Sequence, residues 1–319
     1  MKAGTNTPTL LSLLLICILG SCSKKDNPAL PGDGMYASKQ FEDAEINVLQ
    51  VEYSRRANFQ QLQYTSELTK SVELTKDTLR MKMDVYMPPN ATPIKKQPLL
   101  VMIHGGGFVG GDKNAWKPEA FTYATAGYIC ATINYRLTRQ GGNQSPELRM
   151  YAVTTALEDA QNAIRFLKKN ADTYFIDTSR IIVFGGSAGG ALSLLNAIEY
   201  DAGSGTSDWP GFSSRTNGSI STGASLVNDD PANQPGSFQY DAWDSPVLMF
   251  HAKEYDSNNN NYTWTQNAVP TQQAINASGN SCILVAQPDM THTVNLSLGG
   301  EYWQDLQPFL WGRLRLDEL

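Results

Sequence analysis

The stretch Ile181-Ile182-Val183-Phe184-Gly185-Gly186-Ser187-Ala188-Gly189-Gly190 decides how this chain of 319 residues is interpreted. A short β-branched and aromatic run ends in a Gly-x-Ser-x-Gly pattern, and a stretch compatible with a helix follows at 191–200. A serine at a sharp turn between a strand and a helix takes a strained backbone conformation and exposes its hydroxyl. Glycines beside it let the strand, the helix and a ligand approach closely. The pattern therefore predicts a nucleophilic serine at Ser187.

The composition is that of a soluble globular protein. Hydrophobic residues make up 41% and charged residues 18%, and the length is enough for one large α/β domain. The net charge of -6, without a basic cluster, argues against binding to nucleic acid. The sequence shows no cluster of metal ligands and carries no feature that predicts an oligomeric state.

The N-terminus predicts export. Its apolar stretch is too short to span a bilayer, which is typical of a signal peptide. The sequence Leu19-Gly20-Ser21-Cys22 resembles the lipobox of bacterial lipoproteins. We expect a signal peptide over 1–21, a lipidated Cys22, and a flexible polar tether over 22–40. The expected location is the bacterial cell envelope, at the outer membrane or cell surface, with the lipid as the only membrane attachment.

The remaining residues, 41–319, predict a single α/β domain. Apolar and polar residues alternate over 79–87, which predicts a half-buried antiparallel strand paired across a turn at 76–77 with residues 72–75. Continuous apolar runs follow and predict strands buried on both faces. These runs are 99–103, 128–133, 181–184, 224–227, 247–250 and 283–286. Helical stretches separate several of them, most clearly at 155–170, so we expect a mostly parallel, doubly wound sheet flanked by helices.

A glycine loop follows the first of these runs. His104-Gly105-Gly106-Gly107-Phe108 comes directly after the run at 99–103. Three glycines after a buried strand leave backbone N–H groups free to point at a ligand, as in the oxyanion hole of Gly-x-Ser-x-Gly hydrolases. The loop lacks the spacing of nucleotide-binding glycine motifs. We therefore interpret it as a binding loop for a developing oxyanion, which His104 shapes by hydrogen bonding.

The candidate base follows from position. The chain has three histidines, and His251 ends a strand ahead of the acidic candidates. His292 lies in a loop after the last apolar run and is C-terminal to both the serine and those acids. This location predicts that His292 is the base that activates Ser187.

The candidate acid is less sharply defined by the sequence. Asp256 follows the strand that ends near His251, at the edge where sites in α/β sheets collect. Glu254 lies two residues nearer the strand and is an alternative, as is Asp244. Asp289 is too close to His292 in sequence to be preferred.

The order Ser187, Asp256, His292 is the order of α/β-hydrolases. With the motifs at 104–108 and 185–190, and with Ile133-Asn134-Tyr135-Arg136-Leu137, the chain resembles α/β-hydrolase-fold esterases of the hormone-sensitive-lipase and carboxylesterase-like group. The resemblance runs from Leu79 to a C-terminal helix near Trp311. It implies that the N–H groups of Gly106, Gly107 and Ala188 form the oxyanion hole, with Asn134-Tyr135-Arg136 as a structural bracket below the site.

Two departures from that group stand out. The residue before the serine is Gly186, where hormone-sensitive-lipase relatives usually have Asp. By having glycine at this position, the chain resembles relatives assigned to ferulate, acetyl or formamide substrates. Asp256 also lies one residue later after His251 than the usual His-Gly-x-x-Asp spacing implies.

The resemblance implies a serine esterase that hydrolyses carboxylic esters through an acyl-enzyme, without cofactor or metal. The expected substrate is a small-molecule or carbohydrate ester with a short acyl chain, including acetyl or feruloyl groups on polysaccharide. The alternatives are an amidase or peptidase on the same fold, and a non-catalytic lipid-anchored binding protein on a hydrolase scaffold. Four loop tryptophans either stack on a substrate or anchor packing. They are Trp116, Trp209, Trp243 and Trp264.

Overall fold

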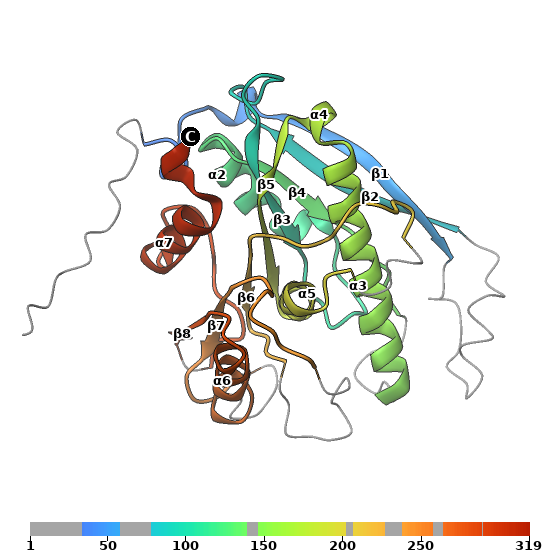
Figure 1. Cartoon of the computed structure of the whole chain (residues 1–319), viewed down its shortest axis with the longest axis vertical. Coiled ribbons are helices and arrows are strands. Elements are labelled where there is room, and N and C mark those ends of the chain that lie inside the picture. Colours follow the sequence, from blue (N-terminus) through green and yellow to red (C-terminus); the bar gives the residue numbers. More distant parts are fainter. Residues whose placement is uncertain are drawn as a thin grey trace, which may run out of the picture.

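One twisted sheet of eight strands runs through the molecule, and helices cover both of its faces (Figure 1). The computed structural model describes residues 34–57, 78–138, 146–201, 207–226, 238–257, 264–288 and 290–319. The strand order is β1-β2-β4-β3-β5-β6-β7-β8. The strands are β1 (Asn47–Ala57), β2 (Thr78–Met87), β3 (Gln97–Ile103), β4 (Ile129–Ile133), β5 (Ile176–Gly186), β6 (Gly218–Thr222), β7 (Val247–Ala252) and β8 (Cys282–Gln287).

The pairing confirms the predicted sheet type. β2 is antiparallel to both β1 and β4. From β4 to β8 every neighbouring pair is parallel. Parallel strands need long crossovers, and these carry the helices that cover the sheet. The sheet is thus mostly parallel, with antiparallel strands at its start.

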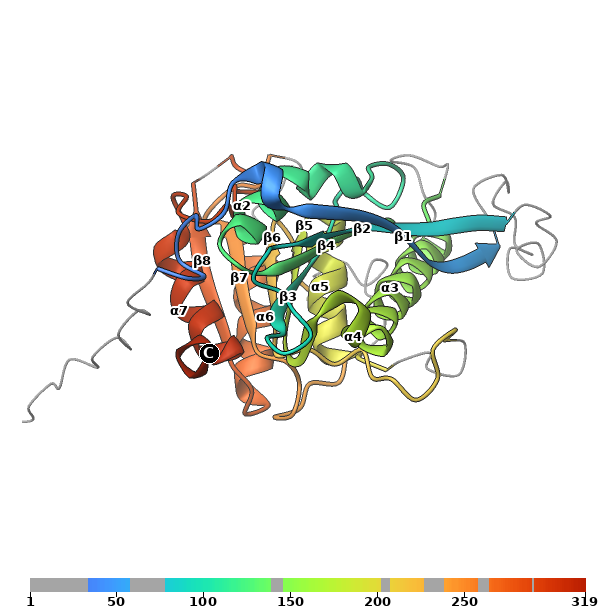
Figure 2. The same ribbon diagram turned by 90° about the horizontal axis from the view of Figure 1, so that it is seen from above.

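The helices divide between the two faces (Figures 1 and 2). They are α2 (Lys117–Thr125), α3 (Pro146–Lys169), α4 (Ala171–Tyr174), α5 (Ala188–Ile198), α6 (Val269–Ala277) and α7 (Trp303–Leu314). Alternate residues of β3 supply both cores. Val101 packs in the core with α3, α5 and α6, whereas Leu100 and Met102 pack with α2 and α7. Both faces of β3 are therefore buried, as its continuous apolar run predicts.

The strand predicted at 224–227 is wrong. The chain instead forms β6 at Gly218–Thr222, whose residues are buried although most are polar or small. Helix α5 lies close to this strand: a Cβ atom at Gly190 would come within 2.7 Å of Ser221 Oγ. Small side chains are needed where a helix approaches so closely, so β6 lacks the bulky apolar run that marks the other strands.

Two other strand predictions need correction. β2 is buried on both faces, because Lys113 forms an ion pair with Asp84 and the ring of Phe121 packs on Tyr86. It pairs with β1, which the sequence analysis did not predict, and residues 72–77 lie outside the described residues. β8 is an edge strand rather than one buried on both faces, since Ile283 is 46% exposed.

The described chain packs against the domain seven residues before the predicted boundary at 41. Tyr36 is buried, and its amide donates to the carbonyl of Ala126 at 2.8 Å. Residues 1–33, with the predicted signal peptide and Cys22, lie outside the described residues. Cys130 and Cys282 are buried free thiols. Within the described ranges no helix has both the length and the apolar character needed to cross a membrane.

Candidate active site

Ser187 lies at the turn between β5 and α5, at the C-terminal edge of the sheet. Its backbone is left-handed, with φ 53° and ψ −119°, a strained conformation for a residue with a side chain. Its amide donates to the carbonyl of Thr222 at 2.8 Å, which ties the turn to β6. A Cβ atom at Gly189 would lie 2.0 Å from the carbonyl oxygen of Ile103, so only glycine lets α5 begin this close to β3. The sheet therefore holds the serine in its strained turn.

His292 and Asp256 complete a hydrogen-bonded chain with Ser187. His292 Nε2 lies 2.9 Å from Ser187 Oγ. His292 Nδ1 lies 2.9 and 3.0 Å from the two carboxylate oxygens of Asp256, which is fully buried. The carboxylate fixes the tautomer, because Nδ1 must carry the proton that it donates, and Nε2 is then free to accept the serine proton.

The structure places the alternative acids elsewhere. Glu254 is exposed, and Asp244 accepts a hydrogen bond from the backbone amide of Asp241. Asp289 lies outside the described residues. Asp256 is thus the carboxylate that the fold brings to His292, although it lies one residue later than the usual spacing implies.

The glycine loop lies against the serine turn. A Cβ atom at Gly105 would come within 3.1 Å of Ser187 Cβ. Gly106 and Gly107 have φ values of 110° and 60°, and no acceptor in the described part of the chain takes up their amides. The amide of Ala188 stands at the first position of α5, where helical N–H groups have no intrahelical partner. Gly106, Gly107 and Ala188 are therefore placed at the two backbone segments that adjoin the serine.

His104 shapes this loop rather than acting on Ser187. Its ring stacks on Tyr135 with a centroid distance of 4.3 Å, and its Nδ1 lies 2.7 Å from the carbonyl of Gly105. Burial lowers the pKa of His104, so the imidazole is neutral near pH 7. His251 is also buried in β7, and burial lowers its pKa as well. Among the three histidines, the structure brings His292 to the serine.

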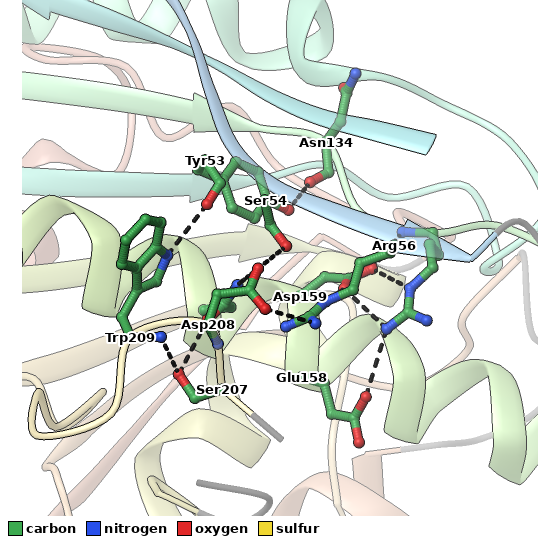
Figure 3. Close-up of polar contacts among 11 residues, drawn as sticks. Tyr53, Ser54, Arg56, Asn134, Glu158, Asp159, Ser207, Asp208 and Trp209 are labelled. Atoms are coloured by element: carbon green, nitrogen blue, oxygen red, sulfur yellow. Dashed lines mark hydrogen bonds and ion pairs between the residues drawn. The ribbon is translucent and has the colours of Figure 1, made fainter. Parts of the chain in front are cut away.

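The segment Asn134-Tyr135-Arg136 lies below the glycine loop. The hydroxyl of Tyr135 donates to the carbonyl of His104 at 2.9 Å. Figure 3 shows the carbonyl of Asn134 accepting a hydrogen bond from Tyr53 of β1, at 2.5 Å. Arg136 forms an ion pair with Asp159 of α3 at 2.8 Å. The segment thus joins the loop to both β1 and α3.

Two functional positions were missed by the sequence analysis. Gln287, at the end of β8, is buried, and its Nε2 donates to the carbonyls of Thr291 and His292 at 2.7 and 2.9 Å. Its Oε1 accepts from the hydroxyl of Thr222 at 3.1 Å, and that hydroxyl accepts from the amide of Val294 at 3.0 Å. Thr222 therefore connects the serine turn to the histidine loop. A polar amide at the end of an apolar run was the available signal.

A pocket of about 870 Å³ opens in front of Ser187 and His292. The glycine loop, α2, Arg149 of α3 and residues 293–295 form its walls. Trp116 lines it, with its ring held by a 2.9 Å hydrogen bond from Nε1 to the carbonyl of Ile103. No cluster of three metal-binding side chains is found in the described ranges.

The other three tryptophans lie away from this pocket. Trp209 is a packing anchor that donates to the carbonyl of Tyr53 at 3.1 Å (Figure 3). Its ring packs edge-to-face against Phe166. Trp264 packs partly buried against the core, and Trp243 is 75% exposed. Of the four candidates, Trp116 is thus the one placed to contact a molecule bound beside Ser187.

Comparisons with known proteins agree with this architecture. The family model described as BD-FAE matches residues 83–222. The chain is 31% identical over 129 residues to an ethyl acetate hydrolase of Pseudomonas putida, covering 40% of this chain and 37% of that protein. It is 32% identical over 114 residues to the esterase LipI of Mycobacterium tuberculosis, covering 35% and 32%. The chain thus spans about a third of the length of these curated relatives.

The solved structure of Thermogutta terrifontis esterase 2, phosphorylated by paraoxon, matches more of the fold. It covers 75% of this chain and 90% of its own, with a TM-score of 0.57 and 21% identity. The chain has the α/β-hydrolase fold.

Proposed function

We propose that this protein is a serine hydrolase of carboxylic esters. The observation that carries the proposal is the chain of contacts Ser187 Oγ–His292 Nε2 at 2.9 Å and His292 Nδ1–Asp256 at 2.9 Å. A nucleophile, a base and a group that orients the base are the parts that acyl transfer requires. The printed names of the relatives, an ethyl acetate hydrolase and an esterase, support the same reaction class.

The proposed reaction proceeds in two halves, and the first forms the acyl-enzyme. His292 Nε2 takes the proton of Ser187 as Oγ attacks the ester carbonyl carbon, and the carbonyl oxygen becomes an oxyanion. The amides of Gly106, Gly107 and Ala188 stabilise that oxyanion, since donors aimed at developing charge contribute most to such catalysis. When the tetrahedral intermediate collapses, the C–O bond to the alcohol breaks and His292 returns the proton to the alcohol oxygen.

In the second half a water molecule replaces Ser187 as the nucleophile, and Ser187 becomes the leaving group. The acyl group is now bound to Ser187 Oγ, and His292 removes a proton from a water molecule. The resulting hydroxide attacks the acyl carbon, the bond to Oγ breaks, and the proton on His292 returns to the serine. A carboxylic acid is released and the enzyme is restored. Asp256 keeps Nδ1 protonated and stabilises the imidazolium at both stages.

We propose short acyl groups, acetyl or feruloyl, on a polysaccharide as the natural esters. The printed name of the ethyl acetate hydrolase supports a short acyl ester. The open pocket of about 870 Å³ at Ser187 has room for a group larger than ethyl on one side of the ester. Gly186 before the serine keeps this part of the pocket free of a side chain, with Trp116 Cζ2 3.6 Å from where its Cβ would lie.

Matched ester and amide substrates test the reaction class. We expect turnover of p-nitrophenyl acetate, far slower turnover of p-nitroacetanilide, and loss of ester turnover by about 10⁴-fold or more in Ser187→Ala. The circular dichroism of that variant should match the wild type. Faster turnover of the anilide favours an amidase or peptidase. No turnover of either compound by the wild type indicates a binding protein instead.

We also propose that the protein is a lipoprotein anchored through Cys22 at the bacterial surface or outer membrane. The support is the sequence Leu19-Gly20-Ser21-Cys22 after a short apolar stretch. Labelled palmitate should be incorporated in a bacterial host and lost in Cys22→Ser. Equal labelling of both proteins overturns the proposal.

A further inference from the structure

Glu119 occupies an unusual position in the pocket at Ser187. It lies in the first turn of α2, three residues after Trp116, which immediately precedes the helix, and both side chains line the pocket. Trp116 in turn lies beside Gly186, the residue before the serine. The carboxylate is therefore one helical turn away from a side chain that contacts the nucleophile turn.

The Glu119 carboxylate lacks a partner on one oxygen. Oε2 is buried and has no hydrogen-bond donor among the described residues. Burial raises the pKa of Glu119, and a hydrogen bond from its own amide only partly offsets this. A buried carboxylate oxygen without a donor destabilises the fold, so such an oxygen usually accepts a hydrogen bond from ordered water or from a ligand. Its location in the pocket of Ser187 suggests that the substrate is that ligand.

Arg149 supplies the complementary group. Its guanidinium lies 5.2 Å from the centre of the Phe108 ring, at the end of the glycine loop, and it lines the same pocket. No ion pair of Arg149 with Glu119, or with any other described carboxylate, is formed. The pocket therefore presents, among the described residues, one buried carboxylate oxygen without a donor at Glu119 and an exposed guanidinium at Arg149.

We infer that Glu119 and Arg149 are specificity-determining residues that bind hydroxyl groups of the substrate. A hydroxyl donates one hydrogen bond and accepts others, so a sugar can satisfy both residues at once. Glu119 accepts from one hydroxyl, and Arg149 donates to another or to a ring oxygen, with Trp116 as the wall beside them. A plain alkyl or aryl ester has no hydroxyl and therefore offers Glu119 no donor. This inference rests on the proposed ester hydrolysis and assigns its substrate preference to named side chains.

The test compares two acetyl esters. Acetylated xylotriose and p-nitrophenyl acetate share the acetyl group, and only the first carries sugar hydroxyls. In Glu119→Gln and Arg149→Met we expect kcat/KM on acetylated xylotriose to fall roughly 10- to 100-fold, as loss of a charge-assisted hydrogen bond implies. On p-nitrophenyl acetate it should stay within about twofold of the wild type. Glu301→Gln removes an equal charge from an exposed position and serves as the matched control.

Two further readouts separate this role from a structural one. The Tm of Glu119→Gln should be equal to or above that of the wild type, because the variant removes an unpartnered buried charge. Xylotriose, the deacetylated product, should bind the wild type and bind Glu119→Gln at least about tenfold more weakly in calorimetry. That measurement does not depend on turnover, so it tests Glu119 even if the ester assay fails.

Equal losses on both esters overturn the inference, since Glu119 would then act on the reaction or the fold. An unchanged kcat/KM on acetylated xylotriose, or unchanged xylotriose binding, overturns it as well. A wild type that binds xylotriose through Glu119 but hydrolyses neither ester refutes the proposed function and leaves the binding role supported.

Discussion

Asp159 and Asp256 are both fully buried, but their partners differ in one decisive property. Asp159 on α3 faces the Arg136 guanidinium, with Nε at 2.8 Å and Nη2 at 2.9 Å. Asp256, after β7, faces His292 Nδ1 at 2.9 Å. Arginine keeps its proton at every physiological pH, whereas histidine exchanges one. The first pair is therefore a permanent ion pair, whereas in the second pair the carboxylate orients a histidine that exchanges a proton through its other nitrogen.

The positions of the two pairs match these roles. Asp159 lies within a long helix and braces the segment after β4, whose Thr138 amide donates to the carbonyl of Phe108 in the glycine loop. Asp256 lies in a loop at the C-terminal edge of the sheet, where His292 Nε2 reaches Ser187. Both residues are buried carboxylates, but Asp159 supports the site from below, whereas Asp256 belongs to the site.

Of the substitutions at these two aspartates, Asp256→Asn should have the largest effect, and it should act on catalysis. The amide cannot orient His292 with Nδ1 as the donor or stabilise the imidazolium, so kcat on p-nitrophenyl acetate should fall by about 10³–10⁴-fold. Steady-state kinetics measure this loss, and urea unfolding checks that the variant is folded. A folded variant with kcat within tenfold of the wild type removes Asp256 from the proposed mechanism.

Asp159→Asn should act on stability instead. It leaves the Arg136 guanidinium buried beside a neutral group, and breaking a buried ion pair in this way costs about 3–5 kcal/mol of unfolding free energy. Urea denaturation measures that loss. Glu158→Gln is the matched control, because Glu158 is 34% exposed and contacts Arg136 at 3.4 Å. Equal effects of the two substitutions on stability contradict the conclusion that the buried ion pair of Asp159 with Arg136 stabilises the fold.

Gln287→Leu tests the hydrogen bonds that hold the loop of His292 in place. Leucine has a similar size but makes none of the hydrogen bonds to Thr222, Thr291 and His292, so the imidazole is no longer held in place against Ser187. We expect a loss in kcat of about 10–100-fold with KM little changed, since small misplacements of a catalytic group are costly. Gln287→Glu keeps the acceptor for Thr222 but has no donor for the carbonyls of Thr291 and His292, so its kcat should stay low as well. A loss in Tm without any loss in kcat assigns Gln287 to the fold alone.

The smallest expected effect is a pH dependence of stability. Burial lowers the pKa of His104 and of His251 below the ordinary 6.5 in the folded state. Unfolding therefore takes up protons once the pH falls below about 6.5, and stability decreases with decreasing pH in that range. Urea unfolding at pH 7.5 and 5.5 should show a smaller decrease in His251→Gln, and an identical decrease argues against a buried neutral His251.

Local sequence patterns predicted much of this fold and of the candidate site. The runs that became β3, β4, β5, β7 and β8 are marked by hydrophobicity, and the serine turn is marked by glycines that close packing requires. The glycine loop, His292 and Asp256 were found from position in the chain order. Each of these signals lies within a few consecutive residues, which is why a single sequence reveals it.

The missed features depend on contacts between distant segments. β6 is polar and small because α5 packs closely on it, and β1 becomes a strand through its pairing with β2. Gln287 gains its role from Thr222, 65 residues away in the chain. Glu119 stands out only because its oxygen is buried without a donor beside Ser187.

The sequence by itself determined the fold class, the strained serine turn and the small set of residues able to serve as base and acid. Backbone sterics and hydrophobic periodicity act locally, so these properties can be inferred from adjacent residues. Only the tertiary structure decided that Asp256, rather than Glu254 or Asp244, faces His292, and that Asp159 braces Arg136 instead. Which buried carboxylate faces the arginine and which faces the histidine depends on how the strands and helices pack, so the three-dimensional arrangement gives the two aspartates their different roles.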